Sequence, residues 1–495
     1  MKTVRSPDDA PVPHRHWVLL GCALAMFTAA IEVTIVATAL PTIITDLGGF
    51  SLLGWVFASY LLTQAVSIPI YGRLADIYGR KRIFFIGTVI FLLGSVLCGA
   101  STSMVWMIIF RALQGIGAGA ITPVAFTIIA DVYSASERPR VQGYLSSVWG
   151  IAAVVGPLAG AFIVQHFPWA LVFWVNVPVG LIAMLLLARF LPDSHRLRQH
   201  QLDLAGAFYL IVCVASLLLT LLQGSELGHW VFLFIALTVT GGILLYRQET
   251  TTPEPLFPLE LWRNRVIVAG NIGGVMIGAA MMGVSAFMPT FIQAVMGRSP
   301  LEAGSILALM SIGWPLASAL SGRLMLWTSY RFTAVAGAIL LIVGSLILLT
   351  LSPDRHLGWA RGACLMIGAG MGMSNTTFLV SVQNTASYSI RGIATASTMF
   401  TRMLGSALGT AILGAALNLS LHWRLPGYDD PVQSLMEPAM RASLPPQQIN
   451  ALIWQVAGSL HTVFIISACI AALTLFSAWL MPSGHQPGGR NNAST

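Results

Sequence analysis

The sequence predicts an all-α membrane protein with fourteen transmembrane helices, arranged as two six-helix halves plus two inserted helices. Three observations lead to this prediction. Hydrophobic residues make up 56% of the 495-residue chain, charged residues only 9%, and the mean hydropathy is +0.78. Apolar stretches that match a bilayer core of about 30 Å recur along the chain. Short motifs also repeat at an offset of about 250 residues.

Fourteen apolar stretches are long enough, or nearly so, to cross the bilayer as helices. In chain order they cover 17–40, 52–71, 83–101, 104–130, 141–164, 168–191, 204–222, 230–246, 266–292, 302–321, 333–352, 359–381, 393–418 and 460–481. They divide the chain into a cytoplasmic tail at 1–16, an N-terminal six-helix half at 17–191, two inserted linker helices at 204–246, a C-terminal six-helix half at 266–481 with an outer loop at 419–459, and a cytoplasmic tail at 482–495.

An internal repeat is the reason for dividing the chain into two halves. Gly72-Arg73-Leu74 follows the second stretch and recurs as Gly322-Arg323-Leu324 after the tenth, an offset of 250 residues. Two glycines of the fifth stretch, Gly156 and Gly160, recur as Gly405 and Gly409 at an offset of 249. Two parallel six-helix halves around a site at the membrane midplane are a transporter architecture.

Several functions are excluded by the same sequence. The only lysines, Lys2 and Lys81, lie outside any G-x-x-x-x-G-K-S/T motif, which excludes a built-in ATP motor of the usual kind. The ten histidines and five cysteines show no metal-ligand spacing. We therefore expect no catalytic residues, no metal site, no cofactor and no separate enzyme domain.

The placement of Lys and Arg predicts the orientation in the membrane. If the N-terminus is cytoplasmic, the inner segments hold 19 of the 26 basic residues and the outer loops hold 5, while Arg111 and Arg402 lie inside spans. Basic residues are enriched in cytoplasmic loops. We expect a multi-pass protein of the cytoplasmic (inner) membrane with both termini inside. The net charge of +8 reflects this topology and does not indicate nucleic-acid binding.

The first stretch contains Glu32, which is the only one of the 18 acidic residues that we place at mid-membrane depth. It lies about eight residues, or roughly 12 Å, from the outer end of its helix. A carboxyl group at this depth is costly, so it faces the protein interior or a wet cavity and by default marks a transport pathway. The alternative is a protonated Glu that only holds two helices together.

The connection between the second and third stretches is rich in glycine and charge: Gly72-Arg73-Leu74-Ala75-Asp76-Ile77-Tyr78-Gly79-Arg80-Lys81-Arg82. Gly72 and Gly79 permit a tight turn between two helices. Asp76 is placed to bond a helix N-terminus in the opposite half, and it shares a helical face with Arg80. With Asp131, at the inner end of the fourth stretch, these residues predict a charge cluster that latches the inner face closed. The alternative is that the arginines only orient the protein.

The fourth and fifth stretches carry two further motifs. Arg111 lies about seven residues from the outer end of the fourth, at the depth of Glu32. Arg111 favours the ionised carboxyl and burial favours the neutral one, so the two residues are predicted to be coupled; the alternative is a static buried ion pair. In the fifth stretch, Gly156 and Gly160 let helices approach closely, and Pro157 bends the axis.

Other polar residues within the stretches are candidates for a cavity, although hydrogen bonds between helices explain most of them equally well. They are Gln64, Gln114, Asn271, Asn375 and Arg402. Arg402 suits three roles: lining a pathway, binding a lipid head group, or capping carbonyl groups. In the 419–459 loop, the segment PPQQINALIWQV is predicted to be an ordinary loop or, alternatively, a short amphipathic helix at the membrane interface.

These motifs resemble those of the major facilitator superfamily, and in particular its fourteen-helix drug:proton antiporters. The resemblance rests on 31–41, 72–82, 156–161, 176–180 and 391–405. It implies the major facilitator fold and proton-coupled efflux of hydrophobic or amphipathic, often cationic, compounds by alternating access. It also implies three groups of site residues: Glu32 and Arg111 for proton coupling, Gly72, Asp76, Gly79, Arg80 and Asp131 for a conformational latch, and Gly156, Pro157 and Gly160 for an antiporter helix motif. Most members carry Asp where this chain has Glu32.

The expected partners are small hydrophobic or cationic substrates, protons and membrane lipids, with the proton gradient as the energy source. An envelope partner bound through 419–459 is a further hypothesis. A second functional hypothesis is export of a lipid or lipid-linked metabolite by the same fold. A third is a membrane scaffold or sensor that transports nothing, although a buried acid and base at one depth argue against it.

Overall fold

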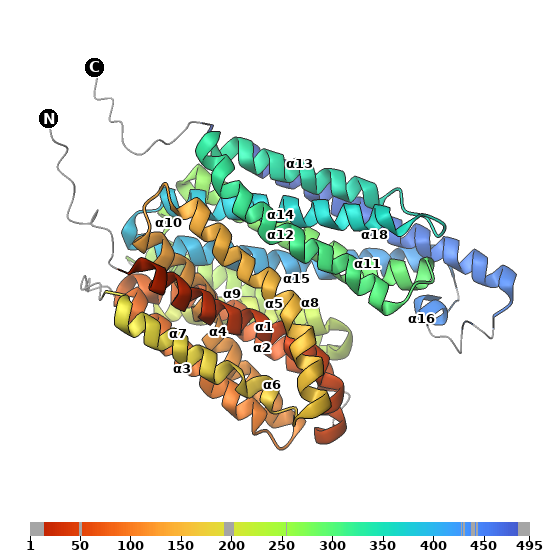
Figure 1. The fold of residues 1–495 in the computed structure, drawn as a ribbon, viewed down its shortest axis with the longest axis horizontal. Helices are drawn as coiled ribbons and strands as arrows, with labels where there is room; N and C mark the ends of the chain where they lie inside the picture. Colours follow the sequence, from red (N-terminus) through yellow and green to blue (C-terminus); the bar gives the residue numbers. More distant parts are fainter. Residues whose placement is uncertain are drawn as a thin grey trace. The chain divides into compact units, whose positions relative to one another are not determined.

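The computed structural model describes residues 14–48, 52–192, 202–253, 255–426, 428, 431–436, 441 and 444–483. Across these ranges the chain is built from helices and contains no strand (Figure 1). Almost all of the two predicted tails, 1–16 and 482–495, lies outside the described residues. The predicted all-α class is confirmed.

The long helices follow the predicted stretches in order. They are α1 (Arg15–Leu47), α2 (Leu53–Tyr78), α3 (Arg80–Gly99), α4 (Met104–Val132), α5 (Arg138–His166), α6 (Leu171–Trp174) continued by α7 (Asn176–Phe190), α8 (Leu204–Leu227), α9 (Trp230–Thr251), α11 (Arg265–Thr290) continued by the π-helical turn Phe291–Val295, α12 (Pro300–Trp327), α13 (Tyr330–Leu348), α14 (Leu357–Thr385), α15 (Arg391–Arg424) and α18 (Pro446–Trp479). Three short helices are α10 (Leu259–Arg263), the 3-10 turn Tyr388–Ile390 and α16 (Pro431–Met436).

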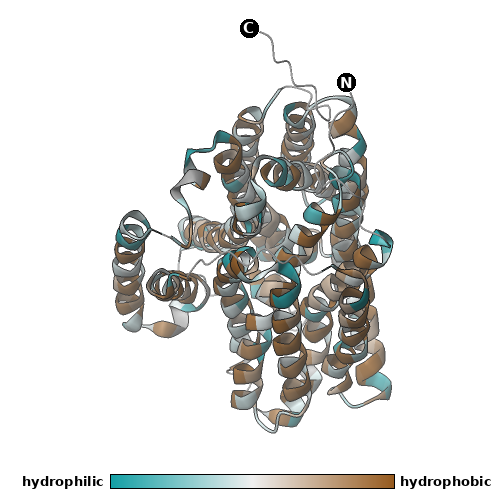
Figure 2. Ribbon diagram, turned by 90° about the vertical axis from the view of Figure 1, so that its left-hand side faces the viewer, coloured by the Kyte–Doolittle hydropathy of each residue, from teal (hydrophilic) through white to brown (hydrophobic). Residues whose placement is uncertain are grey.

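The helix count agrees with the predicted fourteen spans. Within the described residues, thirteen helical segments are long and apolar enough to cross a membrane, and α2, with 26 residues, is a further long helix. Large apolar side chains remain exposed on the outer faces, including Leu158 and Leu185, each 69% exposed. Figure 2 shows apolar residues along most of the helices and hydrophilic residues mostly near helix ends. This is the surface of a multi-pass membrane protein, because lipid rather than water covers it.

Helix ends are set by local capping and by one special backbone conformation. Ser299 begins α12 with a capping box, in which its hydroxyl accepts from the Glu302 N–H and the Glu302 carboxylate accepts from the Ser299 N–H. Asp203 begins α8 by accepting from the Gly206 N–H at 2.9 Å. Gly79 separates α2 from α3 at φ 91°, a value that favours glycine. The predicted tight turn is therefore at Gly79.

Gly72 has a different role from the predicted one. It lies inside α2, one turn and a half before the helix ends, and does not form the turn. A Cβ at Gly72 would lie 2.4 Å from the Cβ of Ala396 and 3.0 Å from the carbonyl oxygen of Gly392. The missing side chain therefore allows close approach of α2 to the start of α15.

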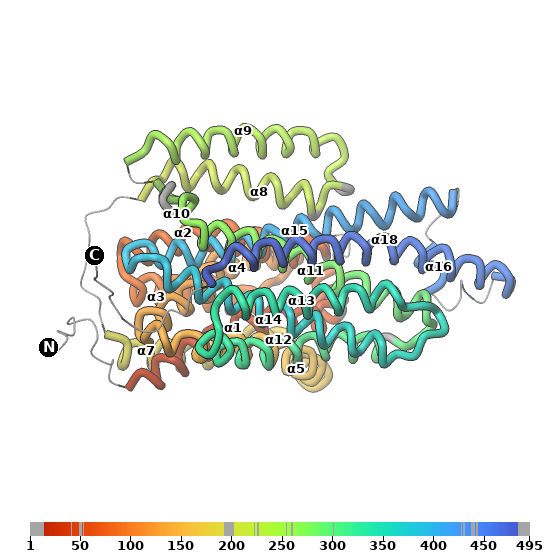
Figure 3. The backbone as a smooth tube through the Cα atoms, turned by 90° about the horizontal axis from the view of Figure 1, so that it is seen from above, coloured from red at the N-terminus to blue at the C-terminus, as the bar shows by residue number. Residues whose placement is uncertain are grey.

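The chain divides into two compact units, which are described separately. The first holds α1 to α10 together with Leu379–Phe400, and the second holds Ala269–Phe378 and the described residues of Thr401–Gly484. In the first unit, α8 packs against α9 and against α2, and Figure 3 shows α8 and α9 side by side. The end of α14 and the first ten residues of α15 thus belong to the first unit, although the sequence division placed them at 266–481.

The internal repeat is visible as an equivalent helix contact in each unit. In the first unit, a Cβ at Gly160 of α5 would lie 2.0 Å from Thr38 Oγ1 of α1. In the second unit, a Cβ at Gly409 of α15 would lie 2.5 Å from the Cα of Ala279 of α11. Each pair of helices approaches too closely for any side chain at the glycine.

Gly160→Ala is therefore expected to destabilise the protein by about 1–3 kcal/mol, the usual cost of overpacking. Besides Thr38 Oγ1, the added methyl group would lie 2.9 Å from the Ile35 carbonyl oxygen, which cannot rotate away. The measurement is thermal unfolding of the purified protein in detergent. The matched control is Gly362→Ala in α14, where a Cβ meets nothing within 4 Å and the helix gains up to about 1 kcal/mol. Equal unfolding temperatures for the two variants would contradict the contact.

The described residues of the predicted loop at 419–459 are largely helical. The PPQQINALIWQV segment is therefore helical, as the second interpretation had it, but it is the start of a long helix and not a short separate one. α15 continues to Arg424, and α18 begins at Pro446, well before the predicted span at 460. Pro445 and Pro446 start that helix, which is the position where proline is tolerated. The segment continues without a break into the membrane span. Leu452, Ile453, Val456 and Ala457 are buried, and this packing stabilises the extension of the helix. Residues 427, 429–430, 437–440 and 442–443 of this region lie outside the described residues.

Candidate functional site

The centre of the first unit contains a fully buried ion pair between Glu32 and Arg111. Arg111 Nη1 donates to Glu32 Oε1 at 2.6 Å, and neither side chain has any exposed surface. Glu32 projects from α1 and Arg111 from α4, 79 residues apart in the chain. The two residues that the sequence placed at one depth are thus in direct contact.

A polar network extends from this pair along α4 and into two neighbouring helices, α3 and α7. Asn176, the first residue of α7, donates from Nδ2 to Glu32 Oε2 at 2.5 Å and to Ser95 Oγ of α3 at 3.0 Å. Gln114, one turn after Arg111, accepts from Arg111 Nη1 at 2.7 Å and donates to Ser95 Oγ at 3.1 Å. Both carboxylate oxygens of Glu32 therefore have a donor, as a buried charge requires.

The Arg111 guanidinium is held on its other side by α2. Its Nε donates to the Val56 carbonyl oxygen at 3.3 Å, and its Cζ lies 4.2 Å from the centroid of the Tyr60 ring. A cation over a tyrosine face is stabilised by the ring quadrupole, more strongly when both are desolvated. Arg111 is thus fixed by a carboxylate, an amide, a carbonyl group and an aromatic ring, all supplied by the first unit.

Apolar side chains surround the network and exclude water from it. Ile35, Val56 and Met107 have no exposed surface, and Ile31 is nearly buried. The low local polarity strengthens the ion pair and raises the cost of leaving either partner alone. A change in the charge of Glu32 therefore has a large effect on the free energy of the helix packing around it.

The glycines of α5 position the part of α1 that carries Glu32. A Cβ at Gly156 would lie 1.9 Å from Thr34 Oγ1, two residues after Glu32 in the chain. Thr34 Oγ1 donates to the Ala152 carbonyl oxygen of α5 at 3.2 Å and to that of Ile31 at 3.0 Å. The predicted helix motif, Gly156, Pro157 and Gly160, thus lies within α5 with both of its glycines against α1.

A second charged cluster lies at the ends of α2, α3 and α4. Arg80 Nη2 lies 2.8 Å from Asp76 Oδ1, and Arg80 Nε lies 2.9 Å from Asp131 Oδ2. The three residues named in the sequence analysis are therefore in contact. Arg391, at the start of α15, adds a fourth charge with Nη1 at 2.5 Å from Asp131 Oδ1. Two acids and two bases alternate in one cluster, and this balances their charges.

Asp76 also caps the N-terminus of α15. Its Oδ1 accepts from the Gly392 N–H at 2.9 Å, and its Oδ2 accepts from the Ile393 N–H at 2.8 Å. These are two of the N–H groups that a helix leaves without an intrahelical partner, and the helix dipole favours a negative charge there. Arg80 adds a link to the preceding turn, since its Nη2 donates to the Tyr388 carbonyl oxygen at 2.7 Å. The cluster thus ties Leu379–Phe400 to the remainder of the first unit.

Asp76→Asn is expected to lower the stability of the purified protein by about 1–2 kcal/mol, because it removes a charged acceptor from a helix N-terminus. The same change leaves Arg80 with one carboxylate partner, Asp131, in place of two. Thermal unfolding in detergent measures the loss. Asp354→Asn, at an exposed carboxyl between α13 and α14, is the matched control. If both variants unfold at the same temperature, Asp76 does not hold this end of the unit together.

A separate ion pair joins the start of α1 to Glu137, the residue that precedes α5. Arg15 Nη1 lies 2.7 Å from Glu137 Oε1. Burial acts to raise the pKa of the Glu137 carboxyl, but hydrogen bonds from the Ser134 hydroxyl and N–H and from Arg15 outweigh it, so the pKa lies below its ordinary value. Glu137 is thus held ionised as a partner for α1, although its exposure limits the energy of the pair.

The other predicted cavity residues are divided between the two units. Gln114 is part of the Glu32 network, and Gln64 is buried on α2 in the same unit. Asn271, Asn375 and Arg402 lie in the second unit, where Asn271 is buried and the other two are half-buried. The Arg402 guanidinium lies 6.0 Å from the centroid of the Trp314 ring, the outer limit of a cation–π contact.

Sequence reasoning missed two residues that the structure makes central. Asn176 was noted only as part of a family motif, yet it is the single amide within 168–191. A lone polar residue in an apolar stretch is a signal for an interhelical partner. Arg391 was noted only as a basic residue of an inner segment and as the first residue of a family motif, and nothing in its local sequence indicates Asp131, 260 residues away.

Comparison with known proteins gives the following matches. A family model described as Major Facilitator Superfamily matches residues 22–410. Multidrug transporter protein MdtP of Bacillus subtilis (strain 168) is 33% identical over 476 residues, which cover 94% of this chain and 87% of that protein. Multidrug resistance protein 3 of the same organism is 32% identical over 483 residues, which cover 93% and 94%.

Two solved structures share the fold at low sequence identity. The human organic anion transporter MFSD10 (TETRAN) matches with a TM-score of 0.65 and 15% identity, over 94% of this chain and 100% of that one. The proton:xylose symporter XylE matches with a TM-score of 0.65 and 15% identity, over 95% of this chain and 96% of that one. At this identity the likeness concerns the fold alone.

Proposed function

This chain belongs to the major facilitator superfamily, and on that premise we propose that it exports hydrophobic or amphipathic, often cationic, drugs across the cytoplasmic membrane in exchange for protons. Two relatives above 30% identity carry names of multidrug transporters, which supports the substrate class. The observation that carries the proton part is the buried pair of Glu32 and Arg111, in which both carboxylate oxygens of Glu32 accept a hydrogen bond. No cofactor takes part in this proposal, since the proton gradient supplies the energy.

The proposed coupling step is a change of protonation at Glu32. When Glu32 is ionised, the 2.6 Å contact with Arg111 balances the two buried charges. A proton on Glu32 removes the negative charge of the carboxylate. The Arg111 cation then has only neutral partners, Gln114 and the Val56 carbonyl group. The helices that carry these groups then prefer a different packing, and that is how a proton biases a two-state transporter.

Asn176 is suited to support both protonation states of Glu32. Its Nδ2 donates to the ionised carboxylate, while its Oδ1 is buried without a hydrogen-bond partner among the described residues. A protonated carboxyl becomes a donor, and an amide turned by 180° presents an acceptor to it. Asn176 would therefore offer Glu32 a partner before and after proton uptake, although the turned amide gives up its hydrogen bond to Ser95 Oγ.

Alternating access supplies the route to water that this step needs. Glu32 has no exposed surface in the described conformation, so proton exchange requires the surrounding helices to separate. We propose that Glu32 takes up a proton facing outward as substrate leaves, and releases it facing inward as substrate binds. The charged cluster of Asp76, Arg80, Asp131 and Arg391 would be the latch that forms and breaks on the cytoplasmic side, where both termini are proposed to lie.

Reconstituted transport tests the proposal directly. Proteoliposomes with an imposed pH gradient are loaded with cationic, neutral and anionic fluorescent compounds in separate assays. We expect cationic and neutral amphipathic compounds to move against their gradients only while the pH gradient lasts, and proton flow in the opposite direction. Transport unaffected by collapse of the pH gradient would refute antiport. A fluorescent lipid in the same vesicles tests the second hypothesis, export of a lipid.

A further inference from the structure

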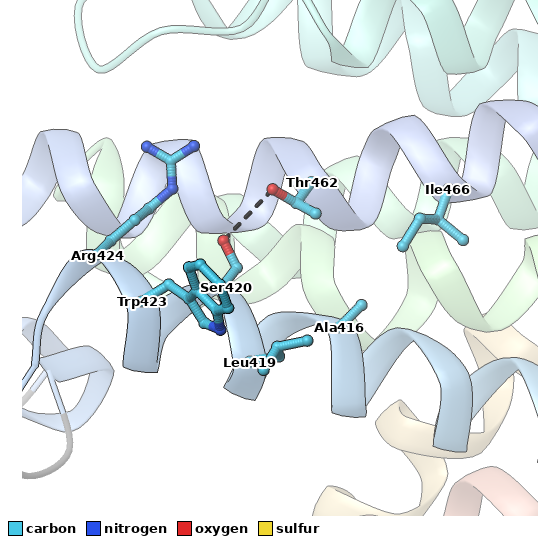
Figure 4. A pocket seen from close by; sticks show the side chains of 7 residues that line it. All are labelled: Ala416, Leu419, Ser420, Trp423, Arg424, Thr462 and Ile466. Atoms are coloured by element: carbon cyan, nitrogen blue, oxygen red, sulfur yellow. Dashed lines mark hydrogen bonds between the residues drawn. The ribbon is translucent and has the colours of Figure 1, made fainter.

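The second unit contains an open cavity between the last turns of α15 and the facing part of α18, on a different pair of helices from the Glu32 network. Its volume is about 510 Å³, within the range of 300–1,000 Å³ typical of small-molecule sites. It is lined by Ala416, Leu419, Ser420, Trp423, Arg424, Thr462 and Ile466. Figure 4 shows these side chains between the two helices.

Along α15 the lining changes from apolar to cationic. Ala416 and Leu419 are apolar, Ser420 adds a hydroxyl group, and Trp423 and Arg424 end the helix. Eight residues from Ala416 to Arg424 correspond to about 12 Å along the axis. The cavity is thus apolar at one end and positively charged at the other.

α18 runs in the opposite direction and shows the same order. Ile466 faces the apolar end, and Thr462 lies within 3.4 Å of Ser420, oxygen to oxygen. At the charged end, a Cβ at Gly458 would lie 2.7 Å from Arg424 Nη1, so the glycine leaves room for the guanidinium. The side chains of α15 and α18 therefore have the same polarity at each end of the cavity, apolar at one end and polar at the other. An amphiphilic molecule has the same division into an apolar and a polar part.

Helix length places the charged end at the depth of lipid head groups. α15 contains 34 residues, which extend for about 51 Å, whereas the hydrocarbon core measures about 30 Å. Its last turns therefore project beyond the core. Trp423 is 78% exposed there, and tryptophan is enriched at the membrane–water interface.

Among the described residues, Arg424 has no partner of opposite charge. It forms no ion pair or side-chain hydrogen bond with any residue in the part of the chain that the structure describes. A guanidinium is a preferred partner of phosphate, which it binds through two parallel hydrogen bonds. An anionic group on the amphiphile would supply the missing charge.

We propose that this cavity binds one membrane phospholipid with an anionic head group. Arg424 binds the phosphate, the hydroxyl groups of Ser420 and Thr462 face the glycerol ester oxygens, and an acyl chain lies along Ala416 and Ile466. A lipid fits better than a protein partner, because the cavity lies between two membrane-length helices and its polarity varies with depth in the bilayer. The site is independent of the drug pathway proposed above and holds a bound lipid, not a cargo.

Lipid titration of the purified full-length protein tests this site. Native mass spectrometry in detergent compares phosphatidylglycerol with phosphatidylcholine of the same acyl chains. We expect tighter binding of phosphatidylglycerol, and about fivefold weaker binding of it by Arg424→Gln. The matched control is Arg355→Gln, an exposed arginine whose Cζ lies 4.9 Å from the ring centroid of exposed Trp359. Equal affinity for the two lipids, or equal losses in the two variants, would overturn the proposal.

Two further variants separate the cavity from general charge effects. Ala416→Phe fills the apolar end and is expected to weaken both lipids, with thermal unfolding showing that the protein remains folded. A photoreactive amino acid in place of Leu419, irradiated in membranes, is expected to give an adduct of the mass of one phospholipid. Unchanged lipid binding by Ala416→Phe, or an adduct of polypeptide mass, would instead refute a lipid site.

Discussion

Glu32→Gln is expected to reduce transport driven by a pH gradient by roughly 5- to 150-fold, the range that corresponds to coupling free energies of 1–3 kcal/mol between linked sites. The amide keeps the shape of the side chain but cannot exchange a proton. The fully buried pair with Arg111, 2.6 Å long, would then remain in one charge state throughout the cycle. The measurement is the initial rate of dye efflux in proteoliposomes or inverted vesicles.

Controls separate loss of coupling from loss of folding. Glu32→Gln is expected to retain dye exchange in the absence of a pH gradient, because substrate binding and the conformational change do not themselves need the proton. Glu32→Asp keeps a carboxyl group and should retain part of the driven transport. Asp354→Asn removes an exposed carboxyl and should change nothing. Driven transport at the normal rate in Glu32→Gln would refute the proposed coupling.

The second large effect is on stability. Glu32→Gln alone leaves the Arg111 cation buried without a counter-charge, and breaking a buried pair in this way costs about 3–5 kcal/mol. Arg111→Met alone is expected to cost less, because a carboxyl can take up a proton whereas a guanidinium remains charged. The double variant Glu32→Gln/Arg111→Met removes both charges and should be more stable than Glu32→Gln alone.

A double-mutant cycle measures this coupling. Unfolding free energies of the four proteins in detergent give the interaction energy, which we expect to be about 2–3 kcal/mol. Gln114 and Asn176 remain in all four and keep their mutual partner Ser95. Additive costs of the two single changes would mean that the residues do not depend on each other, and the proposed role of the pair would then be untenable.

Much of the architecture was predictable because lipid imposes a simple rule on sequence. A segment that crosses the bilayer must form all of its backbone hydrogen bonds internally, as a helix does, and its side chains must be mostly apolar. Each span therefore appears in the sequence as a long apolar stretch. All fourteen predicted stretches therefore coincide with long helices, although the break at Val175 between α6 and α7 was not foreseen. The rule fails where a helix leaves the bilayer. The extension of α18 down to Pro446 depends on buried contacts of Leu452 and Val456, which no local hydropathy signal distinguishes from a loop.

The candidate site was predictable only in part. Glu32 and Arg111 stood out because charges are rare within spans, and depth along a helix follows from residue count. Asn176 is neutral and common enough in membrane helices to escape notice, and its contact with Glu32 spans 144 residues. Gly72 was assigned to a turn because glycine serves in turns and in close helix contacts alike, and only packing against Ala396 separates the two.

By itself, the sequence determined the class of this protein, the number and order of its helices, and which two charges must be buried, since each of these follows from the cost of placing polar groups in lipid. The tertiary structure alone decided which groups satisfy those charges, that Asp76 caps α15, and that α15 and α18 line an open cavity ending in Arg424. The physical reason is that burial cost is a property of one residue and its neighbours in the chain. A hydrogen bond or a cavity wall, in contrast, is a property of two helices that meet only after folding.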